Sequence, residues 1–279
     1  MADIHVVIDS TANIAAETLA QYPNLHVVSL KVILGKQEWL ETKLPPEEMF
    51  QAVARAGGHP TTSQPAVGDF LAVFEPLVKA NKEIIVITLA GALSGTAQGA
   101  RLAARMIGKS DIQIIDSGTT AIGIVHLAEA ALQLVKAGQS MEQIVQHLQA
   151  MIQATHTMFV PGNLDYLHKG GRIGGAAALF GTILQIKPVL YLVDGKVTVL
   201  DKVRTRPKAI TRMLDELRRY PKLARVGIVH HDSVQEAEAL SCQIRELYTY
   251  TSISITTIGA VLCAHLGPGI IGLVFQEEL

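Results

Sequence analysis

Short β-branched runs alternate with helical patterns through the first half of the chain, and this alternation restricts the possible folds more than any other feature. The runs are Ile4–Asp9, Leu25–Leu34, Glu83–Leu89 and Asp111–Asp116. The helical patterns lie at about Pro46–Ala56, Pro65–Ala80, Gly95–Ile107 and Thr120–Ala137. Strands that alternate with helices in this way predict an α/β fold with a mostly parallel, doubly wound sheet.

The pattern changes after a predicted helix at Met141–Ala154 and a predicted strand at Thr157–Pro161. The stretch Val189–Val203 predicts a hairpin that turns at Asp194-Gly195, because Asp-Gly between apolar runs favours a tight two-residue turn. Strand and helix patterns follow to the end of the chain. We therefore predict two closely packed domains, an N-terminal α/β domain (residues 1–155) and a C-terminal α+β domain (residues 156–279).

The composition is aliphatic: 49% of the 279 residues are apolar, but only 5% are aromatic. This composition suits a parallel sheet that is buried on both faces. An aliphatic ligand cavity would need the same composition, so both interpretations stay open. The net charge is −1 and no basic stripe contains interleaved aromatics, so we expect no nucleic-acid partner.

The two cysteines, Cys242 and Cys263, are far apart and lack a CxxC spacing, which argues against a disulfide framework or a metal site. The chain enters a strand pattern at Ile4 without the features of a signal peptide. The longest apolar stretches are interrupted by charged residues or prolines before they reach the length of a membrane helix. We therefore expect a cytoplasmic protein.

Two corners of small hydroxyl residues each precede a predicted helix. They are Thr61-Thr62-Ser63-Gln64-Pro65 and Leu93-Ser94-Gly95-Thr96. Hydroxyls and free N–H groups at helix starts together form a set of donors that suits a carboxylate or a phosphate. Helix capping alone is the alternative explanation. Two such corners in one α/β domain favour a site that binds a small anion without a metal.

Other polar residues have two interpretations each. His265, in an apolar run, is either a hydrogen-bonded core histidine or a third donor to the same anion. Arg172, which follows two glycines, is either part of an ion pair between domains or a phosphate ligand. A solvated surface is the commoner explanation for one further cluster of cations, namely Lys202, Arg204, Arg206, Lys208 and Arg212.

An enzyme is the rival class. The segment Gly91-Ala92-Leu93-Ser94-Gly95 contains a serine after a strand, but its spacing is GxxSG instead of the GxSxG of a nucleophile elbow. Ser94 activated by His265 would make a serine-dependent acyl hydrolase. The residue types allow this alternative, although no acid is evidently placed to orient the histidine.

Eight short motifs occur in an order that resembles the DegV family, the bacterial fatty-acid-binding proteins that include the FakB-type subunits of fatty acid kinase. In the first half these motifs are D-S-T-A-N-I from Asp9, T-S-Q-P from Thr62, L-S-G-T from Leu93 and D-S-G-T from Asp116. In the second half they are K-G-G-R-I-G from Lys169, K-P-V-L from Lys187, R-T-R-P-K-A from Arg204 and H-L-G-P-G from His265.

The resemblance implies a two-domain DegV-like fold that holds one long-chain fatty acid in a buried tunnel between the domains. The residues expected at the carboxylate are Thr62, Ser63, Ser94, Gly95, Thr96 and His265. Those expected at a phosphate or a docked partner are Arg172, Arg204 and Arg206. The aliphatic run at 176–186 is either a tunnel wall or ordinary core, and the expected tunnel residues are Ile173, Leu179, Phe180, Ile183, Leu184 and Ile186.

The resemblance also implies a carrier and not an enzyme. Such a carrier presents the carboxylate of its fatty acid to a separate ATP-dependent fatty acid kinase and delivers the acyl phosphate to an acyltransferase of phospholipid synthesis. A transient contact with a membrane surface is compatible with that role. No cofactor is expected besides the bound fatty acid. The acyl hydrolase and a carrier of another small lipid acid are the alternatives.

Overall fold

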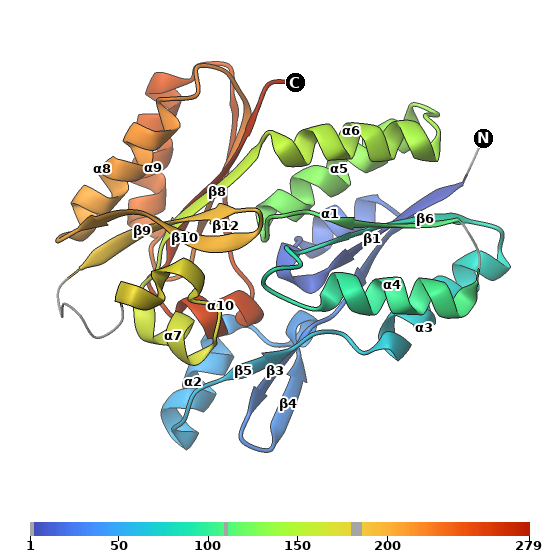
Figure 1. Cartoon of the computed structure of the whole chain (residues 1–279), viewed down its shortest axis with the longest axis horizontal. Helices are drawn as coiled ribbons and strands as arrows, with labels where there is room; N and C mark the ends of the chain where they lie inside the picture. Colours follow the sequence, from blue (N-terminus) through green and yellow to red (C-terminus); the bar gives the residue numbers. More distant parts are fainter. Residues whose placement is uncertain (1–2, 109–110, 180–185) are drawn as a thin grey trace.

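The computed structural model of the protein describes residues 3–108, 111–179 and 186–279. Within this part of the chain, three sheets form the framework, and helices pack around them (Figure 1). A four-stranded sheet belongs to the first half and a six-stranded sheet to the second. A small three-stranded sheet lies beside a short helix of the second half, and this contact joins distant parts of the sequence.

The first sheet is parallel and has the strand order β2-β1-β6-β7. Its strands are β1 (Ile4–Asp9), β2 (Leu25–Val28), β6 (Glu83–Thr88) and β7 (Ile112–Asp116). The two central strands are buried along almost their whole length. Burial on both faces explains why their sequences are continuous aliphatic runs, and the predicted parallel sheet is confirmed.

Helices cover both faces of this sheet, as expected for a doubly wound arrangement. They are α1 (Ala16–Gln21), α3 (Val67–Lys79), α4 (Thr96–Ile107), α5 (Ile122–Lys136) and α6 (Met141–Gln153). On one face α3 and α4 enclose a core around Phe70 and Phe74, while Ile124 and Leu127 of α5 pack in the core on the other face. Figure 1 shows α3 and α4 on one side of the strands, and α5 and α6 on the opposite side.

The second sheet is mixed and has the order β10-β9-β8-β13-β11-β12, in which only β11 and β12 are parallel neighbours. Its strands are β8 (Thr155–Val160), β9 (Lys187–Val193), β10 (Lys196–Val203), β11 (Leu223–His230), β12 (Ser252–Thr257) and β13 (Ile271–Glu277). The helices α8 (Arg206–Leu217) and α9 (Val234–Leu247) pack against it around Met213 and Ile244. The predicted α+β second half is confirmed, and the division near residue 155 stays a prediction.

The third sheet corrects the prediction of one strand at Leu25–Leu34. Its strands are β3 (Lys31–Leu34), β4 (Gln37–Leu40) and β5 (Thr61–Ser63), all antiparallel. The predicted strand is divided at Ser29 and Leu30, where the Leu30 N–H donates to Ser10 Oγ at 2.9 Å instead of to a neighbouring strand. The chain therefore leaves the first sheet and enters the small one.

The first hydroxyl corner does not open a helix, so that prediction is wrong. Thr62 and Ser63 lie in β5, and α3 begins only at Val67, where the Asp69 carboxylate accepts from Ala66 N at 2.8 Å. The second corner does open a helix, since α4 begins at Thr96 and the Thr96 N–H donates to Ser94 Oγ at 3.3 Å.

The tight turn at Asp194-Gly195 is confirmed. The φ angles of Asp194 and Gly195 are 50° and 71°, and such left-handed pairs suit the twist of a hairpin. The remaining helices are α2 (Pro46–Ala56), α7 (Leu164–Lys169) and α10 (Ala260–Leu266), with 3₁₀ turns η1 (Ser10–Ala12), η2 (Glu41–Lys43) and η3 (Gly174–Leu179). None of the described helices has the length and apolar character that a membrane crossing requires.

Candidate ligand-binding site

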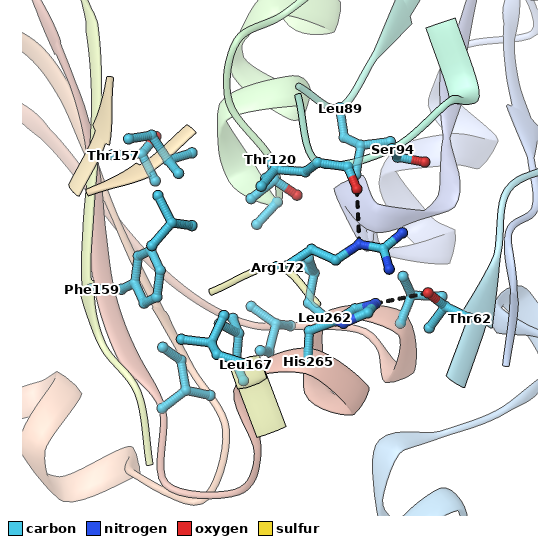
Figure 2. A pocket seen from close by; sticks show the side chains of 18 of the residues that line it. Thr62, Leu89, Ser94, Thr120, Thr157, Phe159, Leu167, Arg172, Leu262 and His265 are labelled. Carbon is cyan, nitrogen blue, oxygen red and sulfur yellow. Dashed lines mark hydrogen bonds between the residues drawn. The ribbon is translucent and has the colours of Figure 1, made fainter. Parts of the chain in front are cut away.

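A cavity of about 300 Å³ lies where the two large sheets and α10 meet. Its walls are mainly apolar and come from both halves of the chain. Leu89 and Leu93 belong to the first half, while Phe159, Leu262 and Val274 belong to the second. Figure 2 shows Phe159 and Thr157 across the cavity from Thr62 and Ser94. The cavity therefore has mainly apolar walls and a polar end near Thr62 and Ser94.

Hydroxyl groups and a histidine form the polar end. Thr62 Oγ1 of β5 lies 2.7 Å from His265 Nε2 of α10, although the two residues are far apart in the sequence. Ser94, in the loop before α4, lies with its Oγ 2.8 Å from Thr96 Oγ1. Thr62, Ser94 and His265 all line the cavity, so the structure brings together the donors that the sequence suggested (Figure 2).

His265 is uncharged at neutral pH. Burial, with smaller contributions from the neighbouring Arg172 and His59, lowers the pKa of its imidazole to about 4. Its Nδ1 is buried and has no hydrogen-bond partner in the described part of the chain. A proton on Nδ1 would need an acceptor, so we assign the proton to Nε2. Nε2–H then donates to Thr62 Oγ1, and the Thr62 hydroxyl proton can be donated to a ligand.

Ser94 has a similar arrangement. Its Oγ accepts from Thr96 N, and Thr96 Oγ1, which is fully buried, can donate to it as well. With these two bonds made, the Ser94 hydroxyl proton is available for an acceptor in the cavity. Thr96 itself lies behind Ser94 and is not among the residues that line the cavity. It supports the site without facing a ligand.

Arg172 brings a positive charge to the polar end. Its Nε donates to Leu93 O at 3.1 Å and its Nη1 to Gly170 O at 2.8 Å, so the guanidinium is held beside the loop that carries Ser94 (Figure 2). It lines the cavity. Within the described residues Arg172 has no ion pair with a carboxylate, and its role as a phosphate ligand stays a prediction.

Three polar residues of the cavity were not expected from sequence. Gln64 lines the polar end and packs against Gly95, where a Cβ atom would collide with its amide group. Its place in the T-S-Q-P motif was the available signal. Thr120 and Thr157 also line the cavity, and Thr157 Oγ1 lies 2.7 Å from Thr119 Oγ1. Nothing in their sequence surroundings distinguishes them from ordinary strand and loop threonines.

Three of the expected tunnel residues do not line the cavity. Ile173 and Leu179 are buried in the core beside the cavity, Ile186 packs against that core, and none of these three lines the cavity. Phe180, Ile183 and Leu184 lie outside the described residues. Ser63 and Gly95, by contrast, do line the polar end. The apolar lining residues come from several elements, among them β8, β9, β11 and α10, so the ordinary-core interpretation fits the described part of the 176–186 run.

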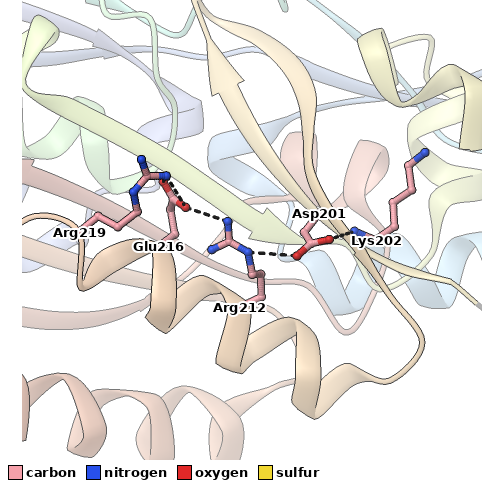
Figure 3. A network of polar contacts seen from close by, with 5 residues as sticks. All are labelled: Asp201, Lys202, Arg212, Glu216 and Arg219. Atoms are coloured by element: carbon pink, nitrogen blue, oxygen red, sulfur yellow. Dashed lines mark hydrogen bonds and ion pairs between the residues drawn. The ribbon is translucent and has the colours of Figure 1, made fainter.

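Two members of the cationic cluster around α8, Arg206 and Arg212, form ion pairs. Arg206 donates to Glu236 at 2.6 Å and to Ser233 Oγ at 3.0 Å. Figure 3 shows Arg212 between Asp201 and Glu216, with Nε at 3.1 Å and Nη2 at 2.9 Å from the two carboxylates. Arg204 is exposed, and within the described residues it has no ion pair. The structure does not bring Arg204 or Arg206 to the cavity.

The cavity lacks the geometry of a serine hydrolase. Ser94 Oγ bonds to Thr96, and His265 Nε2 bonds to Thr62, so within the described residues these two are not hydrogen-bonded to each other. In the same part of the chain, no carboxylate contacts His265 Nδ1. Nor is any group of three or more His, Cys, Asp or Glu side chains there placed to hold a metal ion.

Together, the fold and the cavity define a class: an α/β protein that encloses an apolar small-molecule site with a few convergent polar groups at one end. The family model of the DegV family matches residues 3–278, so the chain belongs to the DegV family. A DegV domain-containing protein from Halalkalibacterium halodurans is 34% identical over 283 residues, which cover 100% of both chains.

Solved structures support the same assignment. A DegV family protein from Thermus thermophilus, described by its fatty acid binding, superposes with a TM-score of 0.91 at 29% identity and covers 99% of this chain and 100% of its own. DegV from Bacillus subtilis, described as a fatty acid binding protein, gives 0.89 at 30% identity with 100% of both chains covered. The expected DegV fold is thus confirmed.

Proposed function

We propose that this protein binds one long-chain fatty acid in the cavity, with the carboxylate at the polar end. The observation that carries the proposal is a mostly apolar cavity that ends in Thr62, Ser94 and His265. The fatty acid binding described for the proteins from Thermus thermophilus and Bacillus subtilis supports the same ligand class.

The polar end suits a carboxylate in particular. A buried carboxylate is costly unless several hydrogen bonds satisfy it. With His265 protonated on Nε2, the hydroxyls of Thr62 and Ser94 can both donate to the two oxygens. Arg172 adds a positive charge beside them, and charge-assisted contacts are the stronger kind. These groups bind a carboxylate without activating a nucleophile.

The apolar walls account for most of the affinity. Burial of an acyl chain contributes roughly 0.8 kcal/mol per methylene, so a long chain gains far more than the head group. Side chains such as Phe159, Leu262 and Val274 provide the necessary contact surface. The head-group contacts therefore set the orientation of the ligand, and the chain sets its affinity.

Mass spectrometry of the lipid content tests this proposal. The purified protein is extracted with organic solvent and also incubated with palmitate before a second extraction. We expect about one long-chain acid per protein molecule. A different lipid acid in stoichiometric amount would mean that the protein binds another class of ligand. The absence of a bound acid from both samples would contradict the proposal. A serine-reactive fluorophosphonate probe, in parallel, is expected to leave Ser94 unlabelled.

As a finer role, we infer that the protein presents the carboxylate to a separate ATP-dependent fatty acid kinase and then passes the acyl phosphate to an acyltransferase of phospholipid synthesis. The polar end carries Arg172, whose guanidinium can pair with a phosphate. Arg204 is exposed near the start of α8 and is available to a docking protein. Arg206 is held by Glu236 and supports the same surface.

Alanine substitution of these arginines separates docking from ligand binding. We expect Arg204→Ala to leave palmitate affinity unchanged and to slow ATP-dependent phosphorylation of the bound acid by the kinase about tenfold, the typical effect of one important interface charge. Arg206→Ala should act in the same direction, but it also breaks the pair with Glu236. Arg101→Ala, an exposed arginine on α4, is the control with the same change in charge. Equal loss of binding and phosphorylation would assign Arg204 to folding or to the site itself.

A further inference from the structure

A buried carboxylate outside the cavity holds one of its walls. Glu41 in η2 is only 6% exposed, and it does not line the cavity. Its Oε2 accepts from Ser10 Oγ at 2.5 Å, and its Oε1 accepts from the Val261 N–H at 2.9 Å. Ser10 Oγ in turn accepts from Leu30 N. Glu41 thus connects η1 and the start of β3 to a segment more than two hundred residues later.

The bond to Val261 fixes the beginning of α10. The first N–H groups of a helix lack partners within the helix, and α10 has no side-chain cap of its own at Gly259. Glu41 supplies the missing acceptor. Gly259 makes this approach feasible, because a Cβ atom there would collide with Glu41 Oε1. The carboxylate and the glycine therefore form one fitted contact.

This helix carries much of the ligand site. Four of its residues line the cavity: Val261, Leu262, His265 and Leu266. His265 lies one turn beyond Val261 and bonds to Thr62. A short helix moves as a unit, so a shift at Val261 displaces His265 relative to the β5 hydroxyls. The position of the donors at the polar end thus depends on Glu41.

The surroundings allow Glu41 to change its charge near neutral pH. Burial raises the pKa of its carboxyl to about 7. The hydrogen bonds from Ser10 and Val261 act in the opposite direction, because they favour the charged form, but their effect is smaller. Asp9, at the end of β1, has its pKa raised by burial to about 6, and burial keeps the Cys263 thiol of α10 protonated. A second cavity of about 480 Å³, lined by Glu41 and Lys43, gives water access to the carboxyl.

We propose that Glu41 is a positioning residue of the fatty-acid site, and that its ionised form tightens ligand binding by holding α10 and His265 in place. The proposal rests on the proposed function. An ionised carboxylate accepts from both Ser10 Oγ and Val261 N, and such charged hydrogen bonds are stronger than neutral ones. Once Glu41 is protonated, its O–H donates to Ser10, and Val261 keeps only a neutral acceptor.

Calorimetric titration with palmitate at pH 6 and pH 8 tests the proposal. In the wild-type protein we expect affinity about threefold higher at pH 8, the size of effect known for charges at helix starts. Glu41→Gln should lose this difference and bind at pH 8 about as the wild type does at pH 6. Glu48→Gln, an exposed glutamate of α2, is the matched control and should follow the wild type. His265, whose pKa is about 4, stays uncharged throughout this range.

Hydrogen exchange gives a second measurement that needs neither variant nor ligand. After correction for the intrinsic rate, the Val261 amide should exchange faster at pH 6 than at pH 8 in the wild type. Equal protection at both values, or a Glu41→Gln protein with wild-type affinity and pH profile, would overturn the positioning role. Wild-type protein that binds no fatty acid would contradict the proposed function instead, and the exchange result would still decide whether Glu41 holds α10.

Discussion

Each donor at the polar end is itself oriented by a second polar group. His265 Nε2 contacts Thr62, and Thr96 contacts Ser94, at 2.7 and 2.8 Å. A hydroxyl that already accepts a hydrogen bond directs its own proton elsewhere, and here the remaining direction is the cavity. At the residue scale, the O–H groups of Thr62 and Ser94 are therefore oriented towards the cavity before a ligand binds.

Removal of either hydroxyl should weaken ligand binding. We expect Thr62→Val and Ser94→Ala each to reduce palmitate affinity by about 1–3 kcal/mol, because a buried carboxylate oxygen loses its donor. Thr61→Val is the matched control, since Thr61 is exposed on the same strand. Calorimetric titration at pH 8 measures the three variants. Wild-type affinity in both site variants would place the head group elsewhere.

The chemistry of the polar end could be predicted from sequence, but its supporting contacts could not. Thr62, Ser94 and His265 are residue types that donate to anions, and their motifs mark them. The reason given for Thr62 was wrong, because it lies in β5 and not at a helix start. Gln64 and Thr157 were missed because only tertiary packing turns them towards the cavity.

At the scale of elements, the turn of the β9–β10 hairpin packs against loops of the first half of the chain. Its turn lies against the loop after β6: a Cβ atom on Gly195 would come within 3.0 Å of Ala90 Cβ. Ala92 and Gly118 are the next neighbours of that position. The turn of this hairpin thus packs beside the segment that leads to Ser94.

Substitution of this glycine tests how closely the turn is fitted. We expect Gly195→Ala to lower the free energy of unfolding by about 1–3 kcal/mol, because its φ is +71° and the added Cβ meets Ala90. Gly35→Ala, in the turn between β3 and β4, has a φ of +61° but open space around it and serves as the control. Urea denaturation gives both values. An equal loss in the two variants would show that only backbone strain matters.

The buried Glu41 carboxyl predicts how stability changes with pH. Its pKa is about 7 in the folded protein and near 4.5, the ordinary value of a glutamate, in the unfolded chain. Between these values the folded state binds the extra proton, so stability falls as pH rises towards 7. Relative to the wild type, Glu41→Gln should therefore gain about 2 kcal/mol of unfolding free energy between pH 5 and pH 8. Denaturant unfolding at both values measures it, and a constant difference would contradict this.

Long elements were predictable, whereas the sheet membership of short ones was not. The helix at Pro46–Ala56 and the turn at Asp194-Gly195 carry strong local signals and are confirmed. The run Leu25–Leu34 is mostly apolar, and contacts such as Leu30 N with Ser10 Oγ divide it between two sheets. A local pattern cannot contain that information.

For the whole molecule, one hydrophobic core joins the two halves. Residues of the first half, such as Ile87 and Ile124, share this core with Phe159 and Val274 of the second. The cavity lies inside this junction, which explains why its walls come from both halves. The aliphatic composition was consistent with either a core or a cavity, and the structure shows that both are present. Which side chains form the walls depends on how the sheets pack, and motifs do not encode that.

A crystal structure of the protein loaded with palmitate tests the central claim most directly. We predict an acyl chain along Phe159 and Leu262, with its carboxylate within hydrogen-bond distance of Thr62 Oγ1 and Ser94 Oγ and beside His265. A carboxylate directed to the opposite end of the cavity, or a ligand bound at another surface, would contradict the account.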